Sequence, residues 1–311
     1  MFKKVVIAGV GLIGGSLGLA LSKRKLAAEV VGVDPNRENL RLAVQVGAVQ
    51  RTETLAEAVP GADLLILATP IGVTLGVLEM AVPYLTPGTV ITDVGSVKGQ
   101  LVDRAEAMLP AGVHFVGGHP MAGREVTGVA GAREDLFEGA SYILTTTQST
   151  NAAACVRLKR FIQALGAHPV ELGCREHDRA VALISHLPHL LAATLVITVA
   201  GEPAQELLLK LAGGGFRDTT RIAAANPTMW RDILLTNREM VLEAVCKFRR
   251  QLEQIEQSMH DFNQEELVSS LEQAKQVREA LPENRKHHIA LQKLYEKLGE
   301  AEGILINNNF R

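Results

Sequence analysis

Blocks of apolar and polar residues alternate along the first part of the chain, in the order that predicts strands and helices in turn. Short, mainly apolar runs rich in Val, Ile and Leu predict strands at residues 4–8, 30–34, 62–69, 89–93, 113–116, 142–145 and 168–171. Stretches with helical spacing lie between them, at residues 12–24, 36–46, 71–82, 97–108 and 151–165, and Asn36 is placed to cap the second helix. This alternation is typical of a mostly parallel sheet with helices on both faces, which binds ligands at the carboxyl ends of its strands.

The strand pattern stops after residue 171, and the rest of the chain predicts helices. These cover 175–200 with a kink expected at Pro188, then a stretch ending at 211, and finally 228–236, 239–260 and 264–281. Three consecutive glycines, 213–215, predict a flexible break. We therefore expect domains at 1–172 and 173–281, and a charged tail at 282–311 that is partly helical over 287–298. The apolar stripes exceed what one helical hairpin buries, so the helical domain is expected to dimerise with a second copy.

Three glycines follow the first predicted strand with the spacing G-x-G-x-x-G. Gly9 is placed to make a tight turn, Gly11 to let a pyrophosphate approach the backbone, and Gly14 to bring the helix close to the strand. Leu12 and Ile13 open that helix, whose first backbone N–H groups point at a bound anion. The sequence therefore predicts an α/β protein whose N-terminal domain is a Rossmann-like, doubly wound, mostly parallel sheet that binds a dinucleotide, followed by the all-helical C-terminal domain.

Asp34 ends the second predicted strand, where its carboxylate would meet a ribose 2′-hydroxyl. A carboxylate at this place repels a 2′-phosphate, so NAD is favoured over NADP, although Arg37 weakens that preference. Thr69 and Pro70 follow the third strand. Because the carboxyl ends of parallel strands share one edge of the sheet, we expect these two residues to line the same cofactor site.

The composition narrows the class of partner. The net charge is −2 and aromatic residues make up 4% of the chain, which argues against a nucleic-acid partner. Three dispersed cysteines fit a reducing cytoplasm and have no metal-ligand spacing. The uncharged run at 181–200 is about long enough to span a bilayer, but its polar residues are costly in lipid, so a helix buried in the protein is expected and no membrane partner.

Several residues have side chains suited to chemistry at the predicted crevice. His119 lies in a glycine-rich stretch at a strand end, where a neutral imidazole can take a hydroxyl proton while a hydride leaves the same carbon. His186 and His189 are three apart on one helix and share a face, which favours a pair that binds an anionic substrate, since no third metal ligand has suitable spacing. Arg217 and Arg221 can each grip a carboxylate, and at least one of them is expected to make a surface or capping interaction instead.

Six motifs in one order give the chain a resemblance to the prephenate/arogenate (cyclohexadienyl) dehydrogenases of tyrosine biosynthesis. The resemblance extends from residue 3 to about residue 281. The motifs are Gly9-x-Gly11-x-x-Gly14, Thr69-Pro70, Asp93-x-x-Ser96-x-Lys98, Gly118-His119-Pro120-Met121-Ala122-Gly123, Ser185-His186-Leu187-Pro188-His189 and Gly215-Phe216-Arg217-Asp218-Thr219-Thr220-Arg221.

This resemblance implies oxidative decarboxylation of a cyclohexadienol, prephenate or arogenate, with hydride transfer to NAD. It implies catalytic roles for His119, which would hydrogen-bond the ring hydroxyl, and for Ser96, which would help to position the ring near the nicotinamide. Arg221 would bind the side-chain carboxylate. The remaining implied residues lie near the substrate or shape its pocket: His189, His186, Glu125, Asp178 and Trp230.

Two alternatives stay open at this level. A β-hydroxyacid or imino-acid dehydrogenase has the same two-domain plan, but the β-hydroxyacid enzymes rely on a lysine from the helical domain, and none lies between Cys174 and Leu209. A catalytically inactive NAD-binding sensor would bind the cofactor without turnover. The set of His119, Ser96 and Arg221 argues against such a sensor.

Overall fold

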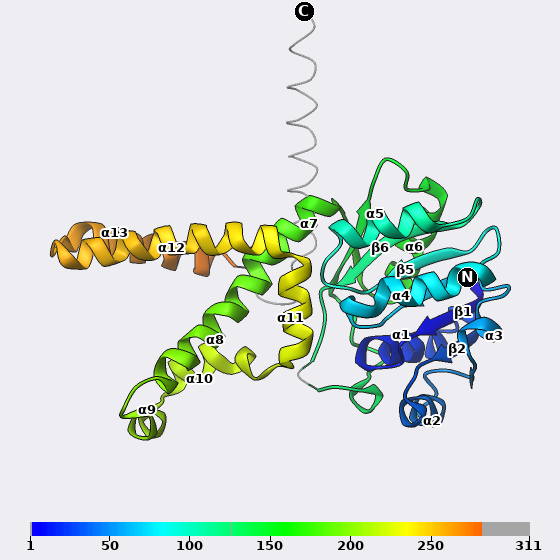
Figure 1. The fold of residues 1–311 in the computed structure, drawn as a ribbon, viewed down its shortest axis with the longest axis horizontal. Helices are drawn as coiled ribbons and strands as arrows, with labels where there is room; N and C mark the ends of the chain where they lie inside the picture. Colours follow the sequence, from blue (N-terminus) through cyan, green and yellow to red (C-terminus); the bar gives the residue numbers. More distant parts are fainter. Residues whose placement is uncertain (1, 125, 282–311) are drawn as a thin grey trace, which may run out of the picture. The chain divides into compact units, whose positions relative to one another are not determined.

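The computed structural model describes residues 2–124 and 126–281, and the chain divides into two compact units, residues 1–245 and 246–311. The first unit contains one eight-stranded sheet (Figure 1). Its strands are β1 (Phe2–Ala8), β2 (Ala27–Val33), β3 (Arg51–Thr52), β4 (Leu64–Leu67), β5 (Val90–Asp93), β6 (His114–Pro120), β7 (Ser141–Thr146) and β8 (His168–Gly173).

Six helices connect these strands: α1 (Leu12–Lys23), α2 (Arg37–Gln45), α3 (Leu55–Ala58), α4 (Ile71–Ala81), α5 (Gly99–Met108) and α6 (Ala152–Ala164), with short turns η1 (Val82–Tyr84) and η2 (Val129–Gly131). The α2 cap is confirmed, because the Asn36 side chain accepts hydrogen bonds from the backbone N–H groups of Glu38 and Asn39. Neither β3 nor α3 was predicted, because two exposed strand residues and one helical turn are too short to show a period.

The strand order is β3-β2-β1-β4-β5-β6-β7-β8, and only β7 runs antiparallel to its neighbour β6 within the described sheet. The predicted doubly wound, mostly parallel sheet is therefore confirmed. The strand order reverses between β1 and β4, so the loops after these two strands diverge and leave a crevice. The glycine loop follows β1 and Thr69-Pro70 follows β4, which puts both motifs at that switch point.

Alternate residues of the central strand β1 face two separate cores. Val5 and Ile7 pack with α1, α2 and α6 on one face, whereas Val6 and Ala8 pack with α3, α4 and α5 on the other. All four residues are almost completely buried. A strand covered on both faces has no polar side, which explains why its sequence is a continuous apolar run.

Strand β6 is longer than predicted. The expectation of a strand at 113–116 treated Gly117 and Gly118 as a loop, but β6 continues to Pro120 and pairs antiparallel with β7 over these last four residues. The glycines serve close packing, since a Cβ at Gly118 would lie 2.5 Å from the Asp93 carbonyl oxygen and 2.8 Å from Thr92 Oγ1. His119 thus belongs to a paired strand, which holds its backbone more firmly than a loop would.

The helical part of the first unit begins with α7 (Cys174–Val181), a π-helical turn η3 (Ala182–His186) and α8 (Leu187–Ala200). The expected kink at Pro188 stays a prediction. The structure places a π-helical turn directly before Pro188, which lies in the first turn of α8 within one continuous helix. Cys174–Ala200 is long and apolar enough to span a membrane by length and composition, but it carries four buried polar side chains, His177, Asp178, His186 and His189.

The helical part continues through α9 (Gln205–Leu211), α10 (Gly214–Thr220), η4 (Arg221–Ala224) and α11 (Pro227–Thr236) into α12 (Arg238–His260). The predicted flexible break at 213–215 is wrong. Gly213 is the N-cap of α10 and its carbonyl accepts from the backbone N–H of Arg217, so the next two glycines form the first turn of a helix.

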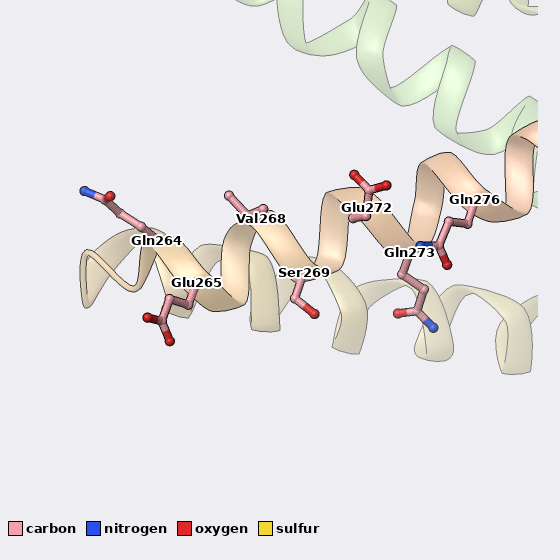
Figure 2. A pocket seen from close by; sticks show the side chains of 7 residues that line it. All are labelled: Gln264, Glu265, Val268, Ser269, Glu272, Gln273 and Gln276. Carbon is pink, nitrogen blue, oxygen red and sulfur yellow. The ribbon is translucent and has the colours of Figure 1, made fainter.

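The second unit contains the end of α12 and α13 (Gln264–Glu279), which runs back beside it (Figure 1). Asn263 caps α13 by accepting from the backbone N–H of Glu266. Figure 2 shows a hollow along α13 that is lined mainly by amide and carboxylate side chains: Gln264, Glu265, Val268, Ser269, Glu272, Gln273 and Gln276. None of these belongs to the predicted site. The expected helix at 287–298 lies outside the described residues.

We expect Gly118→Ala to lower the free energy of unfolding by about 1–3 kcal/mol, because the added methyl group meets backbone that cannot retreat. Urea unfolding measures the change. The matched control is Gly123→Ala, whose Cβ would have no neighbour within 4 Å. Equal stability of the two variants would contradict close packing at Gly118.

Candidate active site

The glycine loop after β1 has the geometry of a phosphate-binding turn. Gly9 has φ +94°, and a Cβ there would lie 2.5 Å from the Ala68 carbonyl oxygen at the end of β4. A Cβ at Gly14 would collide with the Gly9 carbonyl oxygen. Gly11, in contrast, has no atom of the described residues near its Cβ position within 4 Å, and no side chain in the described part of the chain caps the N-terminus of α1. The free N–H groups of the first turn therefore face a space that an anionic group can enter.

Asp34 and Thr69 flank this turn at the ends of β2 and β4. One oxygen of the Asp34 carboxylate accepts from the backbone N–H of Val10 at 3.0 Å, and the other accepts from Asn36 N–H at 2.8 Å. These bonds fix the carboxylate beside the glycine loop and leave it lone pairs for a hydroxyl donor. The Thr69 hydroxyl bonds that of Thr74 at 3.0 Å, which ties the residue before Pro70 to the first turn of α4.

A buried ion pair joins the end of β5 to the loop before α5. Asp93 and Lys98 are both fully buried and their side chains are paired. Burial lowers the pKa of Lys98, and the Asp93 carboxylate opposes that shift. Asp93 also accepts from the backbone N–H groups of Gly95 at 2.8 Å and Gly118 at 3.0 Å. The carboxylate thus replaces the sheet hydrogen bond where β5 ends, and it supports β6 just before His119.

A second buried carboxylate, Asp178 on α7, caps α5. Its Oδ1 accepts from the backbone N–H of Lys98 at 2.8 Å, and its Oδ2 accepts from that of Gly99 at 2.7 Å. Oδ1 also lies 2.8 Å from Nδ1 of His177, and Nε2 of His177 lies 2.8 Å from Nδ1 of His119. A continuous hydrogen-bonded chain therefore runs from the N-terminus of α5 through α7 to the His119 ring.

His119 is held as a neutral imidazole. Burial places its pKa well below the ordinary value, and the neighbouring His177, Lys98 and His186 shift it in the same direction. A ring that is neutral and has one nitrogen engaged by His177 keeps the other nitrogen available to a ligand. This is the condition that a proton acceptor at neutral pH requires.

Three buried polar atoms that have no hydrogen-bond partner among the described residues gather around Trp230: Nε2 of His186, Nδ1 of His189 and Nε1 of Trp230 itself. The His189 ring stacks on the Trp230 ring at 3.6 Å, and the His186 ring meets it edge-on at 6.0 Å. Burial lowers the pKa of His186 to about 4 and also lowers that of His189, which the Ile222 carbonyl opposes. Both rings are therefore neutral near pH 7.

The hydrogen-bond partners assign the role of each atom in this group. Nδ2 of Asn237 donates to the Asp178 backbone oxygen at 2.8 Å and to His186 Nδ1 at 3.2 Å, so the proton of the neutral His186 is on Nε2. The His189 ring donates to the Ile222 carbonyl, which leaves Nδ1 as an acceptor. Two donors and one acceptor thus face an aromatic wall. A buried polar atom without a partner costs about 1–3 kcal/mol, which a bound polar ligand would recover.

The other predicted residues lie at various places in the first unit. Ser96 is partly buried in the loop between β5 and α5, and its hydroxyl has no hydrogen bond to another described residue. Arg217 makes a capping contact, because its Nε donates to the carbonyl of Ala212 at the end of α9. Arg221 starts η4 with an exposed side chain, next to Ile222, whose carbonyl holds His189. Glu125 lies outside the described residues.

Two domains of one known protein family match successive parts of the chain. The nucleotide-binding domain of prephenate dehydrogenase matches residues 17–171, and the dimerization domain of prephenate dehydrogenase matches residues 174–273. A prephenate dehydrogenase of Bacillus subtilis (strain 168) is 40% identical over 305 residues, which is 97% of this chain and 82% of that protein. The chain belongs to the prephenate dehydrogenase family.

Solved structures of this family agree with the fold. A prephenate dehydrogenase from Aquifex aeolicus in complex with hydroxyphenyl propionate and NAD⁺ superposes with a TM-score of 0.86 and 34% identity, over 91% of this chain and 99% of that one. An arogenate dehydrogenase from Synechocystis gives a TM-score of 0.79 and 33% identity, over 89% and 99%. Membership of the prephenate dehydrogenase family argues against the alternative of a β-hydroxyacid or imino-acid dehydrogenase.

His177 and Asn237 were not predicted as site residues, and the buried ion pair of Lys98 was not predicted either. Asn237 and His177 have no spacing that links them to His186 or His119, since they lie 51 and 58 residues away in the sequence. Asp178 was expected to shape and gate the pocket. It is buried instead, where it caps α5 and accepts from His177. The one available signal was the adjacent His177-Asp178 pair on a helix that already carried candidate histidines.

We expect acid to destabilise the protein through His186. Its folded pKa of about 4 lies below the ordinary value near 6.5, so the unfolded chain binds more protons between these pH values and the free energy of unfolding falls as the pH falls. His186→Leu should lessen the decline between pH 7 and 5 by about 2 kcal/mol.

Urea unfolding at a fixed protein concentration and both pH values measures this difference. The control is His260→Gln, because His260 is exposed on α12 and should leave the slope unchanged. A His186→Leu slope equal to that of the parent would rule out the neutral, buried state assigned to His186.

Proposed function

We propose that this protein oxidatively decarboxylates prephenate, arogenate or both, with hydride transfer to NAD, in tyrosine biosynthesis. The observation that carries this proposal is a neutral His119 oriented by His177, together with two donors and one acceptor around Trp230 that have no hydrogen-bond partner among the described residues. Such a site suits a substrate with a hydroxyl to deprotonate and anionic or polar groups to hold. The similar proteins named prephenate and arogenate dehydrogenase support the same substrate class.

The glycine loop fits a dinucleotide. Gly11 and the uncapped first turn of α1, including Leu12, Ile13 and Gly14, would hold its pyrophosphate. Asp34 would accept from a ribose hydroxyl, and this carboxylate favours NAD over NADP. Thr69, Pro70 and Ser96 lie at the ends of β4 and β5 on the same edge of the sheet. NAD, when bound there, supplies the hydride acceptor.

His119 acts as the base. Its free Nε2 takes the proton of the ring hydroxyl as hydride leaves the same carbon. The bond to the ring carboxylate then breaks, CO₂ departs, and its electron pair makes the ring aromatic. His119 returns the proton to the oxygen, which becomes the phenol of the product. The charges balance without a net proton, so the residue needs only to hold this proton briefly and to orient the ring, with Ser96 as a second contact.

The polar atoms around Trp230 would hold the rest of the substrate. His186 Nε2–H and Trp230 Nε1–H would donate to its oxygen atoms, and His189 Nδ1 would accept from a donor. Arg221 would bind the side-chain carboxylate in a bidentate fork, and Glu125 would shape the pocket. These roles rest on the geometry of the pocket and on the family resemblance.

We also propose that the protein is a homodimer in the cytoplasm. Dimerisation is supported by the match to a dimerization domain and by large apolar side chains that remain exposed on α8 and α9: Leu195, Val196, Ile197, Leu207, Leu208, Leu209 and Leu211. The cytoplasmic location rests on the three free cysteines. The division into domains at 172 and 281 is retained as part of this proposal.

Steady-state kinetics with prephenate, arogenate and 3-hydroxyisobutyrate, each with NAD and NADP, test the function. We expect turnover of at least one cyclohexadienol with NAD, and none of 3-hydroxyisobutyrate. His119→Asn should lower kcat by about 10²–10⁴-fold without weakening NAD binding, because it removes only the proton acceptor.

The matched control is His114→Asn, at the opposite end of the same strand, which should leave kcat unchanged. NAD binding without turnover of either cyclohexadienol would indicate the inactive sensor instead. Near-normal kcat in His119→Asn would remove His119 from the mechanism.

A further inference from the structure

The buried chain Asp178–His177–His119 contains a histidine that touches neither the crevice nor the solvent. His177 is fully buried, and both of its ring nitrogens are engaged at 2.8 Å, one by Asp178 and one by His119. Packing alone would not require this arrangement, since an apolar side chain of similar size would fill the volume without needing two polar partners. The two contacts therefore indicate that His177 has a role that acts through His119.

The donors and acceptors along the chain are assigned from Asp178 outward. Both oxygens of Asp178 already accept from the backbone N–H groups of Lys98 and Gly99, and a carboxylate has no proton to give. Nδ1 of His177 must therefore donate to Asp178, and we infer that Nε2 of the same ring is the acceptor toward His119. That acceptor faces Nδ1 of His119, so the proton of the neutral His119 is on Nδ1 and its Nε2 carries a free lone pair.

We propose that His177, held by Asp178, is a positioning residue that fixes His119 in the tautomer and ring orientation required of a base. This inference rests on the proposed function, in which Nε2 of His119 accepts the hydroxyl proton. If the proton were on Nε2 instead, His119 could only donate to the hydroxyl and could not remove its proton. When His119 takes the proton, its Nδ1–H remains bound to His177, so the ring keeps its orientation.

The other titratable groups near His119 do not perform this task. Lys98 and His186 lie close enough to lower its pKa, but neither has a hydrogen bond to its ring among the described residues. Lys98 is engaged by Asp93, and His186 by Asn237. The His119 tautomer therefore depends on His177 alone, and it should change when the acceptor at this position is removed.

Two substitutions distinguish the effect of the hydrogen-bond acceptor at position 177 from the effect of side-chain volume there. His177→Leu fills the space and removes the acceptor. His177→Gln keeps a donor and an acceptor side by side, and because the Asp178 carboxylate attracts the amide NH₂ group, the amide oxygen is directed toward His119. We expect kcat to fall by about 10²–10³-fold in His177→Leu and to stay within about tenfold of the parent in His177→Gln, with both KM values within about threefold in each.

The tautomer can be observed directly by NMR of the full-length protein labelled with ¹⁵N in its histidine rings. The chain has nine histidines, and the His119 signals are assigned by their loss in His119→Asn. We expect the proton on Nδ1 of His119 in the parent and in His177→Gln, and on Nε2 in His177→Leu. This readout needs neither substrate nor NAD.

Two results would overturn the proposal: a parent His119 with its proton on Nε2, or a His177→Leu variant with unchanged tautomer or unchanged kcat. Failure of the proposed function is distinguishable from both. Full activity of His119→Asn would remove His119 as the base, whereas the NMR assignment would still report whether His177 sets its tautomer. If His177→Leu and His177→Gln unfold at the same temperature, the difference between their kcat values reflects the positioning of His119 and not a loss of stability.

Discussion

The geometry of the site depends on one buried carboxylate. Asp178 accepts from two backbone N–H groups at the start of α5 and from the ring of His177 on α7, so it joins the nucleotide-binding part of the first unit to its helical part. A buried carboxylate is stable only when such donors surround it, and removing any one of them leaves a costly charge. The strength of that requirement makes the relative placement of α5, α7 and His119 rigid.

Asp93 is a second buried carboxylate whose donors fix the strand that carries His119. It pairs with Lys98 and accepts from Gly118, so the position where β5 ends is fixed by charge as well as by the sheet. Both carboxylates contact Lys98. The Lys98 side chain pairs with Asp93, and its backbone N–H donates to Asp178. The proposed base is thereby supported by buried groups on neighbouring elements, which is how a site keeps its geometry before substrate arrives.

Features that depend on local sequence could be predicted, whereas features that depend on long-range packing could not. The glycine turn, the Asn36 cap and the central strands follow from spacing and burial within a few residues. The extension of β6 through Gly117 and Gly118 was missed because a glycine that permits close approach looks the same in sequence as one that breaks a strand. The contact between His119 and His177 joins residues 58 apart, and no periodic pattern in the chain relates them. The unpartnered atoms around Trp230 likewise could not be predicted, because α8 and α11 come together only in the folded structure.

A crystal structure with NAD and a 4-hydroxyphenyl product or analogue would show whether a neutral His119 offers Nε2 to the ring hydroxyl. We expect the ring hydroxyl oxygen within about 2.6–3.2 Å of Nε2 of His119, with Nδ1 still bound to His177. A hydroxyl held only by other side chains, with the His119 ring turned away from it, would be incompatible with His119 as the base.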